Sequence, residues 1–177
     1  MELGQDRKIA ALTFMFMCTF FILEGDNMFN EKYMRLALKL AKKAYKKGEI
    51  PVGAVIVYKN KVISKTFNKK EKNNCALYHA EVIAIKKACK KLKNWRLENC
   101  DIYVTLEPCP MCASLIHQSR ISNVYFGANN KNEITKIITE QIYSDNSTNF
   151  INNVCGNYFN KECSEILSDF FEKRRKK

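Results

Sequence analysis

Two short motifs contain residue types that bind metal ions. His79 lies at the start of one predicted helix, and Cys109 and Cys112 lie three positions apart at the start of another. Two cysteines at that spacing in the first turn of a helix share one face, and the helix dipole there favours the thiolate, the form that binds metal. A zinc ion with three protein ligands keeps its fourth position for water, as catalytic sites do. The motifs therefore predict a catalytic site for one Zn²⁺ per subunit, with His79, Cys109 and Cys112 as ligands.

Glu81 is a candidate for moving protons at such a site. It follows His79 by two positions, so its carboxylate can meet a zinc-activated water without occupying the metal. Taken alone, a His-x-Glu is weak evidence, because a glutamate in the first turn of a helix is usually only a partner of the helix dipole. The Pro-Cys-x-x-Cys piece at residues 108–112 is far rarer, and the chain has only 2 histidines, so nothing completes a zinc finger. Glu81 favours an enzyme over a non-catalytic, zinc-stabilised RNA-binding protein, which has no use for a proton shuttle.

The composition indicates a globular chain with a basic balance. With 177 residues, 46% of them apolar and 27% charged, the chain suits one domain with a sizeable core rather than a disordered segment. Lys and Arg total 30 against 18 Asp and Glu, a formal net charge of +12, which could serve a polyanion such as nucleic acid or could reflect a lysine-rich coding composition. Most of the 8 cysteines are scattered singly, unlike a disulfide framework. We therefore expect a reducing compartment, the cytoplasm.

The N-terminal segment differs in pattern from the rest of the chain. An apolar run covers residues 9–23, which is shorter than the roughly 20 residues that a membrane-spanning helix needs. Acidic residues offset its positive flank and no small-x-small site follows it, so a cleaved signal peptide is disfavoured. Met28 then opens a cleanly amphipathic segment. We expect an apolar extension outside the fold over residues 1–27, a folded domain over residues 28–177, and no membrane association.

Hydrophobic periodicity predicts the elements that position the two motifs. Strands alternate with helices from about residue 30 onward, an order typical of a layered α/β domain. A two-stranded hairpin with a turn at residues 59–61 precedes the first motif, and each motif opens a helix directly after a loop or a strand. The predicted strands cover residues 52–58, 62–67, 101–106, 123–127 and, more weakly, 150–155, and helices begin near residues 30, 79, 109, 134 and 159.

Longer strings surround both motifs. They are Glu49–Val57, His79–Ile85, Asn94–Leu97, Tyr103–Ala113, Ser119–Ile121, Val124–Ala128 and Cys163–Phe171. Together they resemble the bacterial tRNA-specific adenosine deaminases of the zinc-dependent cytidine and deoxycytidylate deaminase superfamily, densely from about residue 28 to 128 and again near residues 162–175. The resemblance implies an α/β fold, a three-layer α/β/α cytidine-deaminase-like domain with a central mixed sheet of about five strands.

The resemblance implies hydrolytic deamination of the wobble adenosine of a tRNA anticodon loop to inosine. His79, Cys109 and Cys112 would hold zinc. Glu81 would take a proton from the zinc-activated water and deliver protons to the ring nitrogen and then to the departing amine. Asn68 resembles the asparagine that binds the base, although an asparagine after a strand is also an ordinary turn residue. Further substrate-binding candidates are Pro51, Leu106, Phe170, Phe171, Arg174 and Arg175.

The C-terminal candidates have both an RNA-binding and a structural interpretation. Phe170 and Phe171 could stack on bases, and the two arginines after them could pair with phosphates. Phe170 also fits the apolar stripe of the last helix, and a basic tail is most often solvated. The resemblance implies two partners, a tRNA anticodon stem-loop and a second copy of the chain in a homodimer. Moving an unstacked loop base into a pocket costs less free energy than moving a base out of a duplex.

One alternative activity and one departure from the family's pattern stay open. Because the zinc core is shared across the superfamily, the alternative is a free nucleobase or nucleotide deaminase acting on guanine, cytosine or dCMP. In members of the family, a basic residue, an aspartate and then glycines usually come after the Phe-Gly-Ala string. In this chain Asn129 and Asn130 come after it, and the next glycine is Gly156. Loss of an acidic group removes repulsion of nucleic acid and a hydrogen-bond acceptor, so we hypothesise altered tolerance of ribose or loop sequence.

Overall fold

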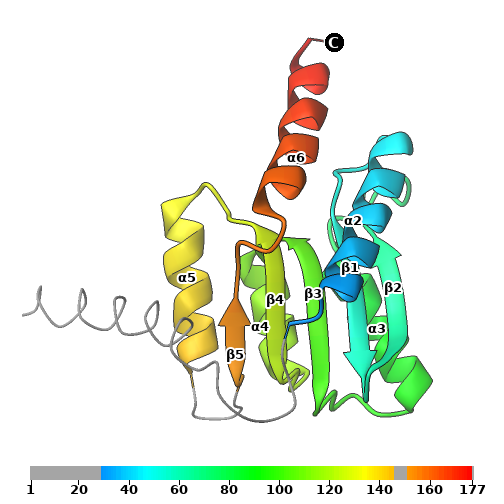
Figure 1. Ribbon diagram of the computed structural model, residues 1–177, viewed down its shortest axis with the longest axis vertical. Helices are drawn as coiled ribbons and strands as arrows, with labels where there is room; N and C mark the ends of the chain where they lie inside the picture. The colour runs from blue at the N-terminus through cyan, green and yellow to red at the C-terminus, as the bar shows by residue number, and fades with distance from the viewer. Residues whose placement is uncertain (1–28, 146–150, 177) are drawn as a thin grey trace, which may run out of the picture.

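Five strands form one mixed sheet at the centre of the structure, a computed structural model that describes residues 29–145 and 151–176. They are β1 Gly53–Tyr58, β2 Lys61–Phe67, β3 Cys100–Leu106, β4 Asn123–Ala128 and β5 Asn153–Cys155. Their order across the sheet is β2-β1-β3-β4-β5 (Figure 1). β1 runs antiparallel to both of its neighbours, whereas β3, β4 and β5 run parallel to one another. The carboxyl ends of β3 and β4 therefore meet at one edge of the sheet.

Helices cover both faces of this sheet. They are α2 Glu31–Lys46, α3 Ala80–Leu92, α4 Pro110–Gln118, α5 Glu133–Ser144 and α6 Asn160–Arg175. α2 and α6 pack on one face, and α3 and α4 pack on the other with α5 beside α4 (Figure 1). Side chains alternate along β1, so that Val55 and Val57 pack toward α2 while Ala54 and Ile56 pack toward α3 and α4. The predicted three-layer α/β/α domain with a mixed sheet of about five strands is confirmed.

The predicted elements match the observed ones to within a few residues. The turn between β1 and β2 holds Lys59 and Asn60 at positive φ, 48° and 57°, which a two-residue hairpin requires. The fifth strand is shorter than predicted, and the start of the prediction, residue 150, lies outside the described residues, as does the extension expected at residues 1–27. Across residues 29–145 and 151–176, no helix is long and apolar enough to cross a membrane.

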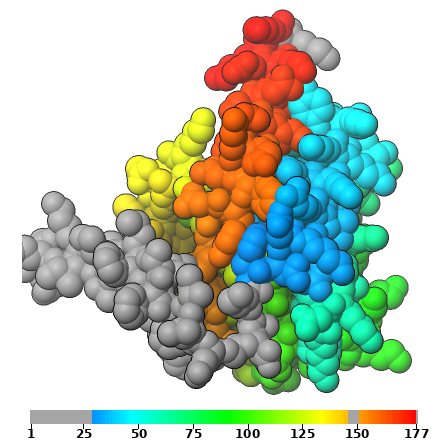
Figure 2. Space-filling view, in the orientation of Figure 1, coloured from blue at the N-terminus to red at the C-terminus, as the bar shows by residue number. Residues whose placement is uncertain are grey.

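Two glycines of the sheet allow α2 and α6 to pack closely against it near the edge where β3 and β4 end. A Cβ atom at Gly53 would stand 2.1 Å from the carbonyl oxygen of Ala37, so a side chain there would push β1 away from α2. A Cβ atom at Gly127 would stand 2.5 Å from the sulfur of Cys163, which belongs to α6. Figure 2 shows the last turns of α6, in red, projecting beyond the rest of this face.

Candidate active site

Two helices begin beside this edge of the sheet, and each has a predicted zinc ligand as its N-cap. His79 caps α3 and Cys109 caps α4, both with an extended backbone. Pro110 occupies the first turn of α4, where its missing N–H costs nothing and its fixed φ suits the helix. Cys112 follows on the same face of that turn. The helix starts predicted from the two motifs are confirmed.

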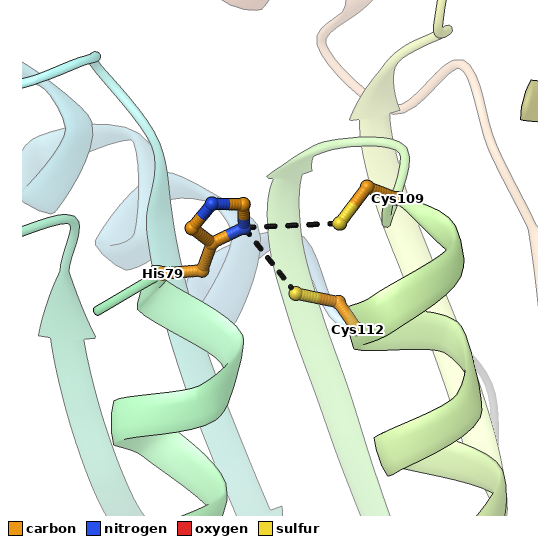
Figure 3. A group of neighbouring side chains, drawn as sticks. All are labelled: His79, Cys109 and Cys112. Carbon is orange, nitrogen blue, oxygen red and sulfur yellow. Dashed lines mark hydrogen bonds between the residues drawn. The ribbon is translucent and has the colours of Figure 1, made fainter. Parts of the chain in front are cut away.

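The three predicted ligands converge between the two helices (Figure 3). His79 Nδ1 lies 3.7 Å from Cys109 Sγ and 3.6 Å from Cys112 Sγ. All three ligand atoms lie within 4.8 Å of one another, and no other group of three or more His, Cys, Asp or Glu side chains is arranged this way in the part of the chain that the structure describes. Zn–S and Zn–N bonds at tetrahedral angles separate sulfur from nitrogen by about 3.6 Å. The donor set and its spacing therefore fit a zinc ion.

Hydrogen bonds and burial shift the pKa values of the two cysteines. The hydrogen bond from Cys112, ahead of the one from His79, lowers the pKa of the Cys109 thiol to about 4. The contact with Cys109, together with burial, raises the pKa of the Cys112 thiol. The lowered pKa of Cys109 favours its thiolate form, and a bound metal ion favours the thiolate at both positions.

Glu81 lies in the first turn of α3 next to the ligand group, and it is only 4% exposed. Its Oε2 atom is buried and has no hydrogen-bond partner among the described residues. Burial raises the pKa of the Glu81 carboxyl to about 6. A carboxyl group with a pKa near neutrality can take up a proton and give it back at physiological pH. The predicted proton shuttle requires these properties.

The pH dependence of stability should reveal this buried carboxyl. In the unfolded chain Glu81 titrates near its ordinary value of 4.5, so the folded metal-free protein binds the proton more tightly and loses stability as the pH rises from 4.5 to about 6. The loss amounts to about 2 kcal/mol. Glu81→Gln, which has no proton to lose, should unfold at higher urea concentration than wild type at about pH 8 and at the same concentration at about pH 4. Equal midpoints at the higher pH would contradict the burial argument.

A pocket opens beside the ligand group, and segments far apart in the sequence form its walls. They come from the residues before β1, the end of β2, the ends of β3 and β4, and α6. Apolar walls with a few convergent polar groups suit a flat, hydrogen-bonding ligand. The lining residues are Ile50, Val52, Asn68, His79, Glu81, Leu106, Glu107, Cys109, Asn130 and Phe171.

Three of the predicted substrate-binding residues, Asn68, Leu106 and Phe171, line the pocket. Asn68 is 4% exposed, and its Oδ1 atom accepts the Ala80 N–H at 2.7 Å. The NH₂ group of the same side chain is left as a donor for a ligand. Pro51 is buried between two lining residues and is not itself among them.

The other C-terminal candidates have different surroundings. Phe170 is buried and packs edge-on against Tyr45 of α2, with ring centroids 5.9 Å apart, so it joins α6 to α2. Arg174 forms an ion pair with Glu71 at 3.3 Å. Arg175 is exposed in the last turn of α6. The two arginines lie on the part of α6 that projects in Figure 2, where a phosphate could reach them.

Sequence reasoning missed three lining residues, Ile50, Val52 and Glu107. Glu107 Oε2 accepts the Asn130 N–H at 2.6 Å and so bridges the ends of β3 and β4. Position was the available signal for Glu107, because it directly follows a strand and ligands of parallel sheets bind at the carboxyl ends of the strands. Ile50 and Val52 carried no comparable signal, since apolar residues before a strand are usually core.

Comparison with known proteins places this site in a family. A model described as the cytidine and deoxycytidylate deaminase zinc-binding region matches residues 28–128, which contain the three converging side chains and Glu81. The chain belongs to this deaminase family. The predicted cofactor, Zn²⁺, is thereby confirmed.

Relatives of this deaminase include enzymes of two substrate classes. It is 40% identical over 148 residues to the tRNA-specific adenosine deaminase of Bacillus subtilis, covering 84% of this chain and 92% of the relative. A structure from a study of A-to-I editing by tRNA:A34 deaminases matches with a TM-score of 0.71 and 35% identity over 78% of this chain and 100% of that one. The guanine deaminase of Bacillus subtilis matches with a TM-score of 0.57 and 33% identity over 70% of this chain and 83% of that one.

Proposed function

We propose that this deaminase converts the wobble adenosine of a tRNA anticodon loop to inosine. The observation that carries the proposal is the buried carboxylate of Glu81, which lies in a pocket beside the group of His79, Cys109 and Cys112. A structural zinc site has no use for such a carboxylate. The tRNA-specific relative supports the substrate class, because this chain covers 92% of it at 40% identity, against 83% at 33% for the guanine deaminase.

The proposed reaction consumes water and releases ammonia. His79, Cys109 and Cys112 would hold the zinc ion, which when bound supplies a water activated for attack at neutral pH. Glu81 accepts a proton from the attacking water and passes protons to the ring nitrogen of adenine and then to the departing amine. Its raised pKa suits both steps, because the group must be a base first and an acid afterwards.

The remaining pocket residues would orient the base and grip the loop around it. Asn68 offers its NH₂ group to the base edge, and Leu106 helps to exclude water from the reacting atoms. Phe171 is 43% exposed and lines the pocket, so it offers an aromatic face to a neighbouring base. Arg174 and Arg175 would pair with phosphates, with Arg174 exchanging its Glu71 partner for RNA.

We also propose that the deaminase domain spans residues 28–177, with residues 1–27 outside it. The protein would be a homodimer in the cytoplasm. α6 lies beyond residue 128, yet it supplies Phe171 to the pocket and packs Cys163 against Gly127, which supports a domain that includes α6. Cys75, Cys89, Cys100 and Cys163, which lie outside the proposed metal site, are free thiols, and this suits a reducing compartment. Sedimentation velocity on the full chain tests the assembly, and a single monomeric species at micromolar concentration would contradict it.

The proposed function is tested by the choice of substrate. Zinc-loaded protein should form inosine in an anticodon stem-loop RNA with adenosine at the wobble position, and none when guanosine occupies that position. Parallel reactions with guanine, cytosine and dCMP should release no ammonia. Ammonia from one of these, with no inosine in the RNA, would favour the free nucleobase or nucleotide deaminase instead.

Asn130→Asp should make the enzyme discriminate more strongly between RNA and DNA. Asn130 lines the pocket, and its backbone bond to Glu107 and its side-chain acceptance of the Asn132 N–H at 3.0 Å are both compatible with aspartate. A carboxylate accepts a hydrogen bond from a ribose 2′-OH more strongly than an amide oxygen does, and DNA lacks that hydroxyl. The ratio of kcat/KM for RNA and DNA forms of one stem-loop should rise by about tenfold. If the ratio of kcat/KM for RNA and DNA stays unchanged, the hypothesis that this position contacts ribose is wrong.

A further inference from the structure

Glu49 is a buried acidic residue that takes no part in the proposed chemistry. It is only 2% exposed. The end of α2 sets its place: Gly48 has a φ of +73°, its N–H donates to the Tyr45 carbonyl at 3.0 Å, and the Glu49 N–H donates to the Ala44 carbonyl at 3.1 Å. This pair of bonds is the Schellman motif, in which a glycine with positive φ turns the chain at the end of a helix. α2 therefore holds Glu49 at a defined position.

Both carboxylate oxygens of Glu49 bind the loop of residues 69–78 between β2 and α3. Oε2 accepts the backbone N–H of Glu71 at 3.0 Å, and Oε1 accepts the backbone N–H of Lys72 at 2.9 Å. Hydrogen bonds to an ionised acceptor are roughly twice as strong as bonds between neutral groups. Because the two donors are adjacent in the chain, the two bonds fix both the position and the direction of the loop.

The two ends of this loop carry residues of the proposed site. The Lys69 N–H donates to the Tyr78 carbonyl at 3.0 Å, so the loop closes on itself between Asn68 and His79. Across this closure, Asn68 Oδ1 accepts the Ala80 N–H at 2.7 Å. The base-binding asparagine and the metal-binding histidine are thus joined by the loop that Glu49 anchors.

We propose that Glu49 is a positioning residue for the pocket: through the loop of residues 69–78 it holds Asn68 and His79 at the spacing that the base and the metal require. Glu49 lines no part of the pocket itself and acts on it through the loop. Ile50 directly follows Glu49 and lines the pocket. Glu49 therefore also connects the pocket wall that contains Ile50 to the loop of residues 69–78. The inference rests on the proposed function where substrate is concerned, whereas its effects on the loop and on metal retention are independent of substrate.

The experiment compares Glu49→Ala, which removes both acceptors, with Glu49→Gln, which keeps one, in the zinc-loaded full chain. In the alanine variant the amides of Glu71 and Lys72 should exchange hydrogen faster, and zinc should pass to a chelator about tenfold faster than in wild type. The kcat/KM for the anticodon stem-loop RNA should fall about 10- to 100-fold at a temperature where the variant is folded. Glu49→Gln should lie between wild type and the alanine variant in amide exchange, zinc release and kcat/KM. If the alanine variant does not fold, Glu49→Gln is compared with wild type in its place.

Tyr33→Phe is the matched control, because it removes a part-buried long-range hydrogen bond to the backbone, as Glu49→Ala removes two. The Tyr33 hydroxyl donates to the Asn60 carbonyl at 2.7 Å, at the β1–β2 turn rather than at the pocket. This variant should lose stability but keep the zinc release rate and kcat/KM of wild type. The proposal is overturned if Glu49→Ala matches Tyr33→Phe within about twofold in both quantities. Should wild type form no inosine, the proposed function fails, and zinc release and amide exchange still decide the role of Glu49.

Discussion

Glu81→Gln should reduce inosine formation in an anticodon stem-loop RNA by about 1,000-fold while the zinc content stays that of wild type. Glutamine has the same size as glutamate but can neither accept nor deliver the proton, and a positioned general acid or base contributes about 10²- to 10⁴-fold to a rate. Glu81 is buried, and its Oε2 atom has no hydrogen-bond partner among the described residues, so the NH₂ group of glutamine can replace Oε2 while Oε1 remains an acceptor. The loss should therefore be chemical rather than structural.

Single-turnover kinetics with enzyme in excess, zinc analysis and a filter-binding measurement of RNA affinity together test this result. Glu162→Gln is the matched control, because Glu162 is an exposed acidic residue in the first turn of another helix, α6. Both glutamates interact with the dipole of a helix, but only Glu81 lies beside the proposed metal site. We therefore expect Glu162→Gln to keep the wild-type rate. Retention of more than about a tenth of the wild-type rate by zinc-loaded Glu81→Gln would remove Glu81 from the mechanism.

Cys112→Ala should strip the protein of its metal and abolish inosine formation. Cys112 is fully buried, and its sulfur lies 3.6 Å from His79 Nδ1, so its loss leaves one thiolate and one imidazole to hold the ion. Two ligands bind zinc far more weakly than three, and we expect zinc affinity to fall by more than about 100-fold. The inosine-forming rate should fall with the zinc content measured on the same sample.

Cys100→Ala controls for the loss of a buried thiol. Cys100 is fully buried in β3 and lies outside the converging group, so this variant should lose some stability but keep its zinc and its rate. Treatment of wild type with a chelator should reproduce the Cys112→Ala phenotype, and added zinc should restore wild type but not the variant. A full complement of zinc in Cys112→Ala would show that the ligand assignment is wrong.

Local spacing was enough to predict that the two cysteines share one helix face, whereas their meeting with His79 was inferred from the set of ligands that a zinc site needs. The positions of Cys109 and Cys112 place both on one face of a helix turn because helices repeat every 3.6 residues, and the structure brings them to His79. The starts of α3 and α4 were predictable from the helical periodicity of the apolar residues that follow each motif. The fifth strand was predicted less accurately, because a strand at the edge of the sheet depends on pairing with β4 more than on its own pattern.

Spacing only partly separated two adjacent aromatic residues of α6. Both Phe170 and Phe171 were candidates for stacking on RNA bases, although Phe170 also fitted the apolar stripe of the helix, which indicated a place in the core. The structure packs Phe170 against Tyr45 and places Phe171 at the pocket. Which of the two faces the pocket follows from the rotation of α6 against α2, a contact between segments far apart in the chain.

The sequence by itself determined the donor atoms of the metal site, their order along the chain and the helix turns that present them, because these depend on residue type and on short-range periodicity. Only the tertiary structure decided the burial that raises the pKa of Glu81, the meeting of Ile50 and Glu107 at one pocket, and the anchoring of a loop by Glu49. Desolvation and long-range hydrogen bonds arise when distant segments pack together, and no local spacing in the chain encodes which segments those will be.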